Sequence, residues 1–228
     1  MATRREKKGR GGATIEDMAD AIRSAMPRLD ATEQQIAIAT YHLLAEGEPV
    51  TSEAVAQVTN NPVGRVEDAF NSWPGVYRDD EGRVVGFWGL TTGRLEPEYR
   101  FLIEGKTSYA WCALDTLFIP ALLGKTVSVE ATDPVTGERV SLVVDQDGVR
   151  DLKPSGAVVS MVIPDGPFGY DVIESFCHKV LFFASEEAGT RWTAEHEGTM
   201  LLSIDEAFEL GRGFERVYPD IFGPRGEN

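Results

Sequence analysis

The chain has 228 residues, of which 42% are hydrophobic, and a formal net charge of −15. This length and composition allow one large domain or two small ones with a real core. The sequence has no run of about 18 apolar residues, so no membrane span is predicted. The acidic balance argues against nucleic acid as a partner, because phosphate groups would be repelled.

The first twelve residues carry five Lys or Arg and one Glu, opposite in sign to the rest of the chain. We expect residues 1–14 to form a disordered basic leader, because a charged, glycine-flanked run buries too little apolar surface to fold. Contact with an acidic partner is the alternative. No apolar segment follows the basic residues, so a secretory signal is not expected and a cytoplasmic location is predicted.

Residues 15–94 combine helix patterns with a hairpin. Capping residues and apolar periodicity predict helices in TIEDMADAIRSAM, TEQQIAIATYHLLAEG, PVTSEAVAQVTN and NPVGRVEDAFNSW. The next segment, GVYRDDEGRVVGFWGLTT, predicts a strand, a turn and a second strand. Helices followed by a hairpin predict a winged-helix-like N-terminal module.

DNA binding is the obvious function for such a module, but the candidate recognition helix argues against it. That helix offers one cation, Arg65, beside Glu67 and Asp68. Phosphate contacts need several Lys or Arg. A structural or lid role is therefore the favoured interpretation.

Residues 95–228 mix strands and helices. Strands are predicted in EYRFLIEG and AVVSMVIPD, and a hairpin in KTVSVEATDPVTGERVSLVVD. A helix is expected over about 108–121, and a short helix or turn holds Cys177 before the strand KVLFFAS. Two helices close the chain, the second with a capping box from Ser203 to Glu206. The predicted fold class is α+β, with a winged-helix-like helical module followed by a mixed or antiparallel sheet and flanking helices.

Cys112 and Asp115 lie three residues apart in the apolar stretch YAWCALDTLFIPALLG. On a helix this spacing places both side chains on one face. A buried carboxyl without a partner raises its pKa, and a carboxyl protonated near neutral pH is a ready proton donor. The alternative for Asp115 is a turn cap or a surface ion pair. For Cys112 and Cys177, the two cysteines of the chain, the alternative is two unrelated buried thiols.

Several common site motifs are missing from the sequence. There is no CxxC or HExxH pattern that would predict a zinc site, no P-loop and no GxGxxG. A GxSxG elbow for Ser/His/Asp hydrolysis is also missing. We therefore expect no cofactor. His178, next to Cys177, is interpreted as a structural histidine that faces away from the Cys177 pocket.

The segments around WCALDT and ESFCHKVLFFAS, together with GFWGLT and SIDEAFELG, resemble the alkylmercury lyase family from about residue 35 to 218. The resemblance implies a catalytic set of Cys112, Asp115 and Cys177, the same three residues holding the Hg(II) product. Many members carry another cysteine directly after the second catalytic one, where this chain has His178. That difference leaves the three implied residues intact.

The resemblance implies protonolysis of R–Hg–X to R–H and Hg(II). Thiolates are the ligands that a soft cation prefers, and Asp115 would deliver a proton to the carbon. Cytosolic thiols or a mercuric reductase would then take up the Hg(II). Apolar neighbours would line a substrate pocket, although plain core packing is their alternative role: Trp111, Leu114 and Phe176.

Two other functions use the same residues. A soft-metal-binding or metal-handling protein would capture the metal with this trio and cleave nothing. A regulator would combine a winged-helix reader with a thiol sensor. Release of a hydrocarbon distinguishes the lyase from both.

Overall fold

The computed structural model describes residues 14–222, so the leader predicted for residues 1–14 lies outside the described residues apart from Thr14. The N-terminal part forms the helices α1 (Ile15–Ala25), α2 (Ala31–Leu44), α3 (Ser52–Thr59) and α4 (Val63–Ser72). The strands β1 (Val76–Arg78), β2 (Val84–Phe87) and β3 (Leu90–Thr91) follow. The predicted order of helices before a hairpin is confirmed.

The remaining residues alternate strands and helices. The first elements are β4 (Tyr99–Ile103), β5 (Lys106–Ala110), α5 (Ala113–Leu123), β6 (Val127–Thr132), β7 (Arg139–Asp145), β8 (Gly148–Lys153) and β9 (Val158–Val162). They are followed by α6 (Val172–Ser175), a 3₁₀ turn (Cys177–Lys179), β10 (Phe182–Phe183), α7 (Glu186–Ala194) and β11 (Thr199–Ser203). The described chain closes with α8 (Ile204–Arg212), a second 3₁₀ turn (Gly213–Val217) and α9 (Pro219–Phe222).

Across residues 14–222 the strands form one sheet in the order β1-β2-β3-β5-β4-β6-β7-β8 and a smaller one in the order β10-β9-β11. All of the neighbouring strands pair antiparallel, which confirms the α+β class. Leu90 of β3 pairs with Ala110 of β5, so the N-terminal hairpin extends the sheet of the second half. The division into modules of residues 15–94 and 95–228 stays a prediction about folding units.

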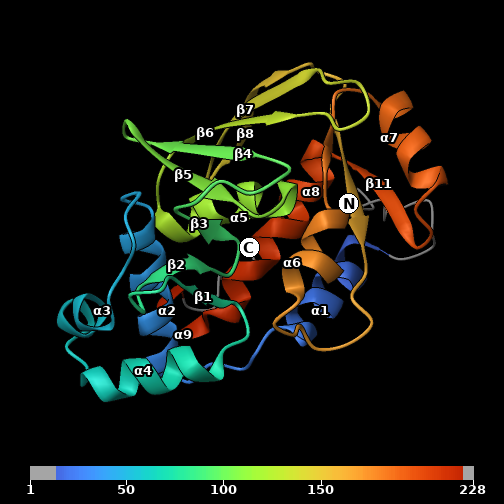
Figure 1. Ribbon diagram of the computed structural model, residues 1–228. Helices are drawn as coiled ribbons and strands as arrows, with labels where there is room; N and C mark the ends of the chain where they lie inside the picture. The colour runs from blue at the N-terminus through green and yellow to red at the C-terminus, as the bar shows by residue number, and fades with distance from the viewer. Residues whose placement is uncertain (1–13, 223–228) are drawn as a thin grey trace, which may run out of the picture.

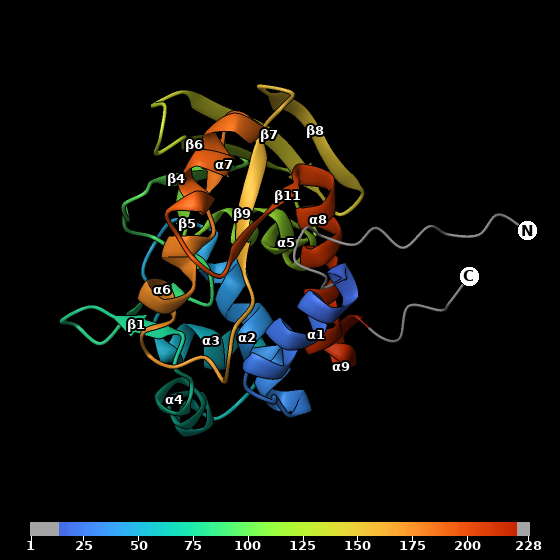
Figure 2. The ribbon, with the colours of Figure 1, turned by 90° about the vertical axis from the view of Figure 1, so that its right-hand side faces the viewer.

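The helix α5 lies beneath the large sheet, with α8 packed along it (Figure 1). Almost every residue of α5 is buried, because apolar side chains surround the helix on all sides and each side faces another element. In the turned view, α6 and α7 lie on one side of β9, and α1 and α8 on the other (Figure 2). The N-terminal end of α5 therefore lies deep inside the molecule.

The helix expected over 108–121 is placed wrongly. Residues up to Ala110 form β5, and the helix covers Ala113–Leu123 with Pro120 inside it. The helix ends one residue before Gly124, whose left-handed φ of 61° suits a C-terminal glycine. No helix in residues 14–222 has the length and apolar character that crossing a membrane requires.

Candidate active site

Cys112 and Asp115 form the first turn of α5. Cys112 is the N-cap residue, in an extended conformation, and its N–H donates to Asp115 Oδ2 with an N···O distance of 2.9 Å. In return, the backbone N–H of Asp115 points to the Cys112 side chain, which completes a capping box. The two side chains are therefore brought together by the start of the helix, and the expectation that both lie on the helix itself is wrong for Cys112.

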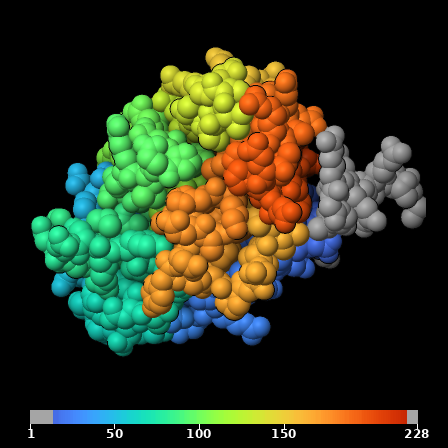
Figure 3. Space-filling model, turned by 45° about the vertical axis from the view of Figure 1, so that its right-hand side comes forward, coloured from blue at the N-terminus to red at the C-terminus, as the bar shows by residue number. Residues whose placement is uncertain are grey.

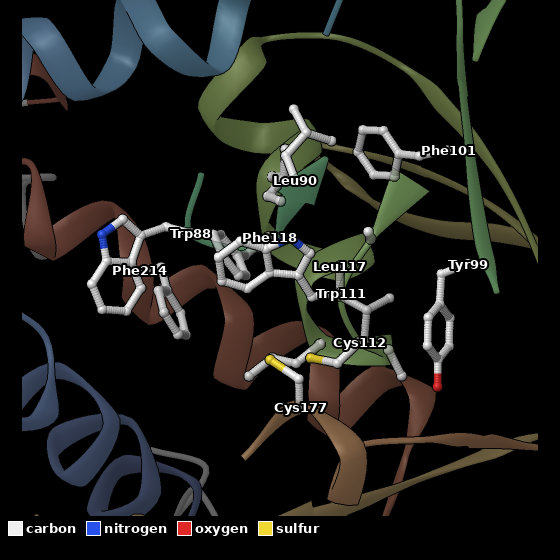
Figure 4. Close-up of a cluster of buried hydrophobic side chains, with 14 of the residues drawn as sticks. Trp88, Leu90, Tyr99, Phe101, Trp111, Cys112, Leu117, Phe118, Cys177 and Phe214 are labelled. Carbon is white, nitrogen blue, oxygen red and sulfur yellow. The ribbon is translucent and has the colours of Figure 1, made fainter. Parts of the chain in front are cut away.

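Cys177 reaches the same place from a segment 65 positions later in the numbering of the chain. It opens the 3₁₀ turn that follows α6, as the predicted short helix or turn. The N–H of Ala113 donates to the carbonyl of Val180 at 3.0 Å, which ties this segment to the start of α5. The sulfur atoms of Cys112 and Cys177 lie beside each other in the close-up (Figure 4).

The structure brings together all three residues that the sequence analysis selected. Their ligand atoms, two sulfurs and one carboxylate oxygen, lie within 4.8 Å of one another, and all three residues are buried. Both thiols are free. Such a cluster offers two soft ligands and one oxygen to a single cation or its organic compound.

Burial controls the protonation of the carboxyl. It raises the pKa of Asp115 to about 7, although the hydrogen bonds from the thiol and the backbone of Cys112 lower it. A carboxyl with this pKa both accepts and donates a proton at neutral pH. The N-terminal end of α5 favours negative charge at this position, which lowers the cost of an ionised group there.

The pKa of both thiols is raised above the ordinary value, but to different extents. Burial is the largest cause that raises the pKa of Cys112 well above its ordinary value, and its hydrogen bonds to Cys177 and Asp115 raise it further. The hydrogen bond from Cys112 lowers the pKa of Cys177, while burial and Asp115 raise it by more. The pKa of Cys177 is thus raised less than that of Cys112, and Cys177 is the thiol better able to carry a negative charge.

A cavity of about 30 Å³ opens beside the trio. Asp115 and Cys177 line it, whereas Cys112 does not. The three predicted pocket residues, Trp111, Leu114 and Phe176, all line this cavity. Their role toward a substrate stays a prediction.

Other cavity residues were missed by sequence reasoning. They come from α1 and its C-cap, from the turn after β2, from the loop before α6 and the first residue of α6, and from the C-terminal 3₁₀ turn: Ile22, Met26, Trp88, Gly89, Phe168, Val172 and Phe214, with Phe118 of α5. Rings from distant segments meet there, for example Phe118 and Phe214, stacked with centroids 4.2 Å apart. Figure 4 shows Trp88, Trp111, Phe118 and Phe214 to one side of the two sulfurs.

His178 does not line the cavity. It belongs to the 3₁₀ turn, so the argument from strand alternation does not apply, because the strand begins only at Phe182. The His178 side chain is 37% exposed, and its Nδ1 lies 3.3 Å from Glu174 Oε2. The expectation that it faces away from the pocket therefore agrees with the geometry, for a different reason.

The chain resembles known proteins in both parts of its sequence. A sequence model of alkylmercury lyase matches residues 94–215, and a model of the helix-turn-helix domain of alkylmercury lyase matches residues 13–88. The alkylmercury lyase of Bacillus cereus is 44% identical over 75% of this chain and 76% of its own length. That of Staphylococcus epidermidis is 44% identical over 78% and 80%, and that of Streptomyces lividans 40% identical over 75% and 77%.

A solved structure shares the fold. The crystal structure of the mercury-bound form of MerB2 superimposes with a TM-score of 0.70 and covers 90% of this chain and 98% of its own. At 19% identity this likeness supports the fold alone. The two sequence models and the relatives at 40–44% identity carry the assignment: the chain belongs to the alkylmercury lyase family.

Proposed function

We propose that this protein is an organomercurial lyase, which cleaves the carbon–mercury bond of R–Hg–X by protonolysis and yields R–H and Hg(II). One observation carries the proposal: two thiols and a carboxyl, all buried, place their ligand atoms within 4.8 Å of one another. Membership of the alkylmercury lyase family supports it. Mercury enters the reaction as part of the substrate and leaves as product, so no cofactor is required.

Cys177 attacks the mercury first. It lines the cavity, while Cys112 does not, so an incoming substrate meets Cys177 sulfur before it meets Cys112. The pKa of Cys177 is raised less than that of Cys112, so Cys177 is the easier thiol to deprotonate, and the thiolate is the nucleophile. The new S–Hg bond forms as the Hg–X bond breaks, and X leaves with the electron pair of that bond and with the proton of the Cys177 thiol, as HX.

Cys112 and Asp115 then complete the reaction. The Cys112 thiol passes its proton to the Asp115 carboxylate, and the resulting thiolate forms a second S–Hg bond. With both sulfurs bound, mercury has three ligands, and the two sulfurs increase the electron density on the third, the carbon. Asp115 then gives the proton to that carbon as the Hg–C bond breaks. R–H leaves, Hg(II) stays on both sulfurs, and the carboxylate is ionised again. Fixed geometry supplies much of the rate, because three groups meet one substrate without further ordering.

The apolar walls suit the organic group and keep water out. Trp111 packs edge to face against Tyr77 with centroids 5.2 Å apart, and Phe176 packs against Phe168 at 5.1 Å. In a dry site the electrostatic interactions among the sulfurs, the carboxyl and the mercury are stronger than in water. Water excluded from the site cannot compete with the thiolates for mercury.

The Hg(II) product needs an acceptor outside the site. Cytosolic thiols or a mercuric reductase would supply it by ligand exchange, which fits a cytoplasmic location. We expect no nucleic acid partner. Arg65, the single cation of the candidate recognition helix, already pairs with Asp30 at 2.6 Å and with Glu33 at 3.4 Å.

Intact-protein mass spectrometry with phenylmercury as the probe tests the proposal. After one turnover without external thiol, we expect a protein mass increased by one mercury atom without the phenyl group, and benzene in the headspace. A stable adduct that retains the phenyl group, with no benzene, would identify a soft-metal-binding protein and exclude the lyase.

The size of the cavity predicts a substrate preference that one residue can shift. A volume of about 30 Å³ has room for one or two water-sized groups, less than a phenyl ring. Phe168 forms part of the wall, with its ring 6.1 Å from that of Trp88. Phe168→Ala should raise kcat/KM for phenylmercury relative to methylmercury by about tenfold, the scale of a small change in an apolar pocket.

The matched control is Tyr170→Ala in the same loop. Tyr170 is 68% exposed, and its backbone carbonyl keeps the hydrogen bond from Tyr77 in the variant. We expect an unchanged substrate ratio for this variant. A ratio equally unchanged in Phe168→Ala would show that this ring does not limit the size of the organic group.

A further inference from the structure

The two residues that join β2 to β3, Trp88 and Gly89, form a turn directly beside the trio. Both have positive φ values, 35° for Trp88 and 100° for Gly89. A two-residue hairpin with positive φ at both positions is a primed turn, and a bulky residue such as Trp is costly there. Strained backbone of this kind persists where surrounding contacts hold it, often beside functional groups.

Gly89 lies against the carboxyl of Asp115. A Cβ atom at position 89 would lie 2.4 Å from Asp115 Oδ1 and 2.6 Å from its Cγ. These distances are too short for any side chain, so the carboxyl occupies the space that a Cβ would take. Oδ2 accepts the Cys112 N–H. The carboxyl is thus held on one side by the start of α5 and on the other by the backbone of Gly89.

The turn itself is anchored by three hydrogen bonds. The Trp88 N–H donates to Gly75 O at 3.0 Å, and the Trp111 N–H donates to Gly89 O at 2.9 Å. The Tyr41 hydroxyl donates to Trp88 O at 2.7 Å. Tyr41 is fully buried in α2, so this contact links the N-terminal helices to the turn beneath the carboxyl.

We propose that the turn Trp88–Gly89 is the positioning element for the proton donor, with Gly89 providing space for the carboxyl and Tyr41 holding the turn in place. This inference rests on the proposed lyase function. It makes the N-terminal module part of the catalytic geometry, because Tyr41 belongs to that module. Neither residue exchanges a proton with the substrate; both act through the placement of Asp115.

Gly89→Ala tests the proposal with phenylmercury as the probe. The methyl group would displace the carboxyl, and a misplacement of about 1 Å costs about 10²-fold in rate. We expect phenylmercury to be captured as fast as by the wild type, with benzene released about 10²-fold more slowly. This split between capture and release is one that general destabilisation would not produce.

Gly105→Ala is the matched control. Gly105 has a similar φ of 84°, and nothing lies within 4 Å of the position that a Cβ would take there. This variant therefore places alanine at a positive φ, as Gly89→Ala does, but brings its methyl group against no carboxyl. We expect release at the wild-type rate. Equal release by the two variants would overturn the positioning role, and loss of capture in Gly89→Ala would show instead that Gly89 shapes the space for the substrate.

Tyr41→Phe decides the question if Gly89→Ala does not fold. It removes the hydroxyl that holds Trp88 O and keeps the ring, and we expect benzene release to slow about tenfold with capture unchanged. Tyr109→Phe, which removes a surface hydroxyl bonded to Arg94, should release benzene at the wild-type rate. Unchanged release in Tyr41→Phe overturns the proposal, whereas a wild-type protein that releases no benzene refutes the lyase function itself.

Discussion

Cys177→Ala is expected to abolish hydrocarbon release, lowering turnover by about 10³-fold or more, the scale seen when one member of a group that acts as a unit is removed. The variant retains only the sulfur of Cys112. One sulfur cannot raise the coordination number of mercury above two, which the cleavage of the Hg–C bond requires. Cys112 does not line the cavity, and burial raises the pKa of its thiol well above the ordinary value. Capture of R–Hg should therefore also be slow.

Cys112→Ala is the matched variant, since it too retains one thiol. Cys177 lines the cavity, so we expect rapid capture of R–Hg by this variant and, again, no hydrocarbon. Rapid mixing with phenylmercury and quenching at set times, followed by mass spectrometry, measures the capture rate of both variants. Turnover close to that of the wild type in either variant would eliminate the mechanism with two thiolates, and equal capture rates would refute the order of attack.

Segments with strong local signals were predicted well. The capping box at Ser203 is present, with Glu206 accepting the Ser203 N–H at 2.9 Å, and the hairpin of β6 and β7 lies where its turn sequence predicts it. The edge strand β8 was missed because none of its residues is buried, so it lacks the alternation that marks a half-buried strand. It pairs with β7 as a tight hairpin, with Asp145 opposite Gly148, and the Asp147-Gly148 turn signal was not used in the sequence analysis.

The site was predictable to a different degree for each residue. The closeness of Cys112 and Asp115 follows from their spacing, although an N-cap rather than a helix face produces it. The approach of Cys177 depends on backbone contacts such as that between Ala113 and Val180, and only the family resemblance predicted it. The contact of Gly89 with Asp115 could not be predicted from the sequence, because it arises only in the folded chain, where β3 pairs with β5.

The cover of the cavity is likewise a tertiary feature. The segment from residue 163 to α6 contributes Phe168 and Val172 to the cavity wall and is held to α1 by the Phe168 N–H, which donates to Ala25 O at 2.9 Å. In the space-filling view the amber and orange residues of this segment lie at the surface, next to the teal residues around α4 and below the orange-red residues of α7 (Figure 3). This part of the wall therefore exists only once the segment packs on α1 and on Trp88.

Asp115→Asn separates capture from cleavage. Asparagine keeps an oxygen that can accept the Cys112 N–H, so the start of α5 is preserved. It has no acidic proton to deliver, and loss of a positioned general acid costs about 10²- to 10⁴-fold. We expect capture of phenylmercury at the wild-type rate and release of benzene slowed by that factor. Equal slowing of both steps would contradict the role of Asp115 as the acid.

The same variant reports on the buried carboxyl through its stability. The pKa of Asp115 is about 7 in the folded protein and near 3.8 for an ordinary exposed aspartate, so between these pH values the folded protein binds a proton that the unfolded chain has lost. Its contribution to the free energy of unfolding therefore falls as pH rises toward 7 and is constant above it. Asp115→Asn lacks this penalty.

The free energy of unfolding gained by Asp115→Asn over the wild type should consequently be larger at pH 8 than at pH 5. The difference is up to about 3 kcal/mol, because about two pH units separate pH 5 from the folded pKa of about 7. Urea unfolding of both proteins at the two pH values measures it. A gain that does not change with pH would mean that the carboxyl is not held in its protonated form by burial. A gain that grows with pH, together with slowed benzene release, would show a residue that destabilises the fold because its chemistry requires burial.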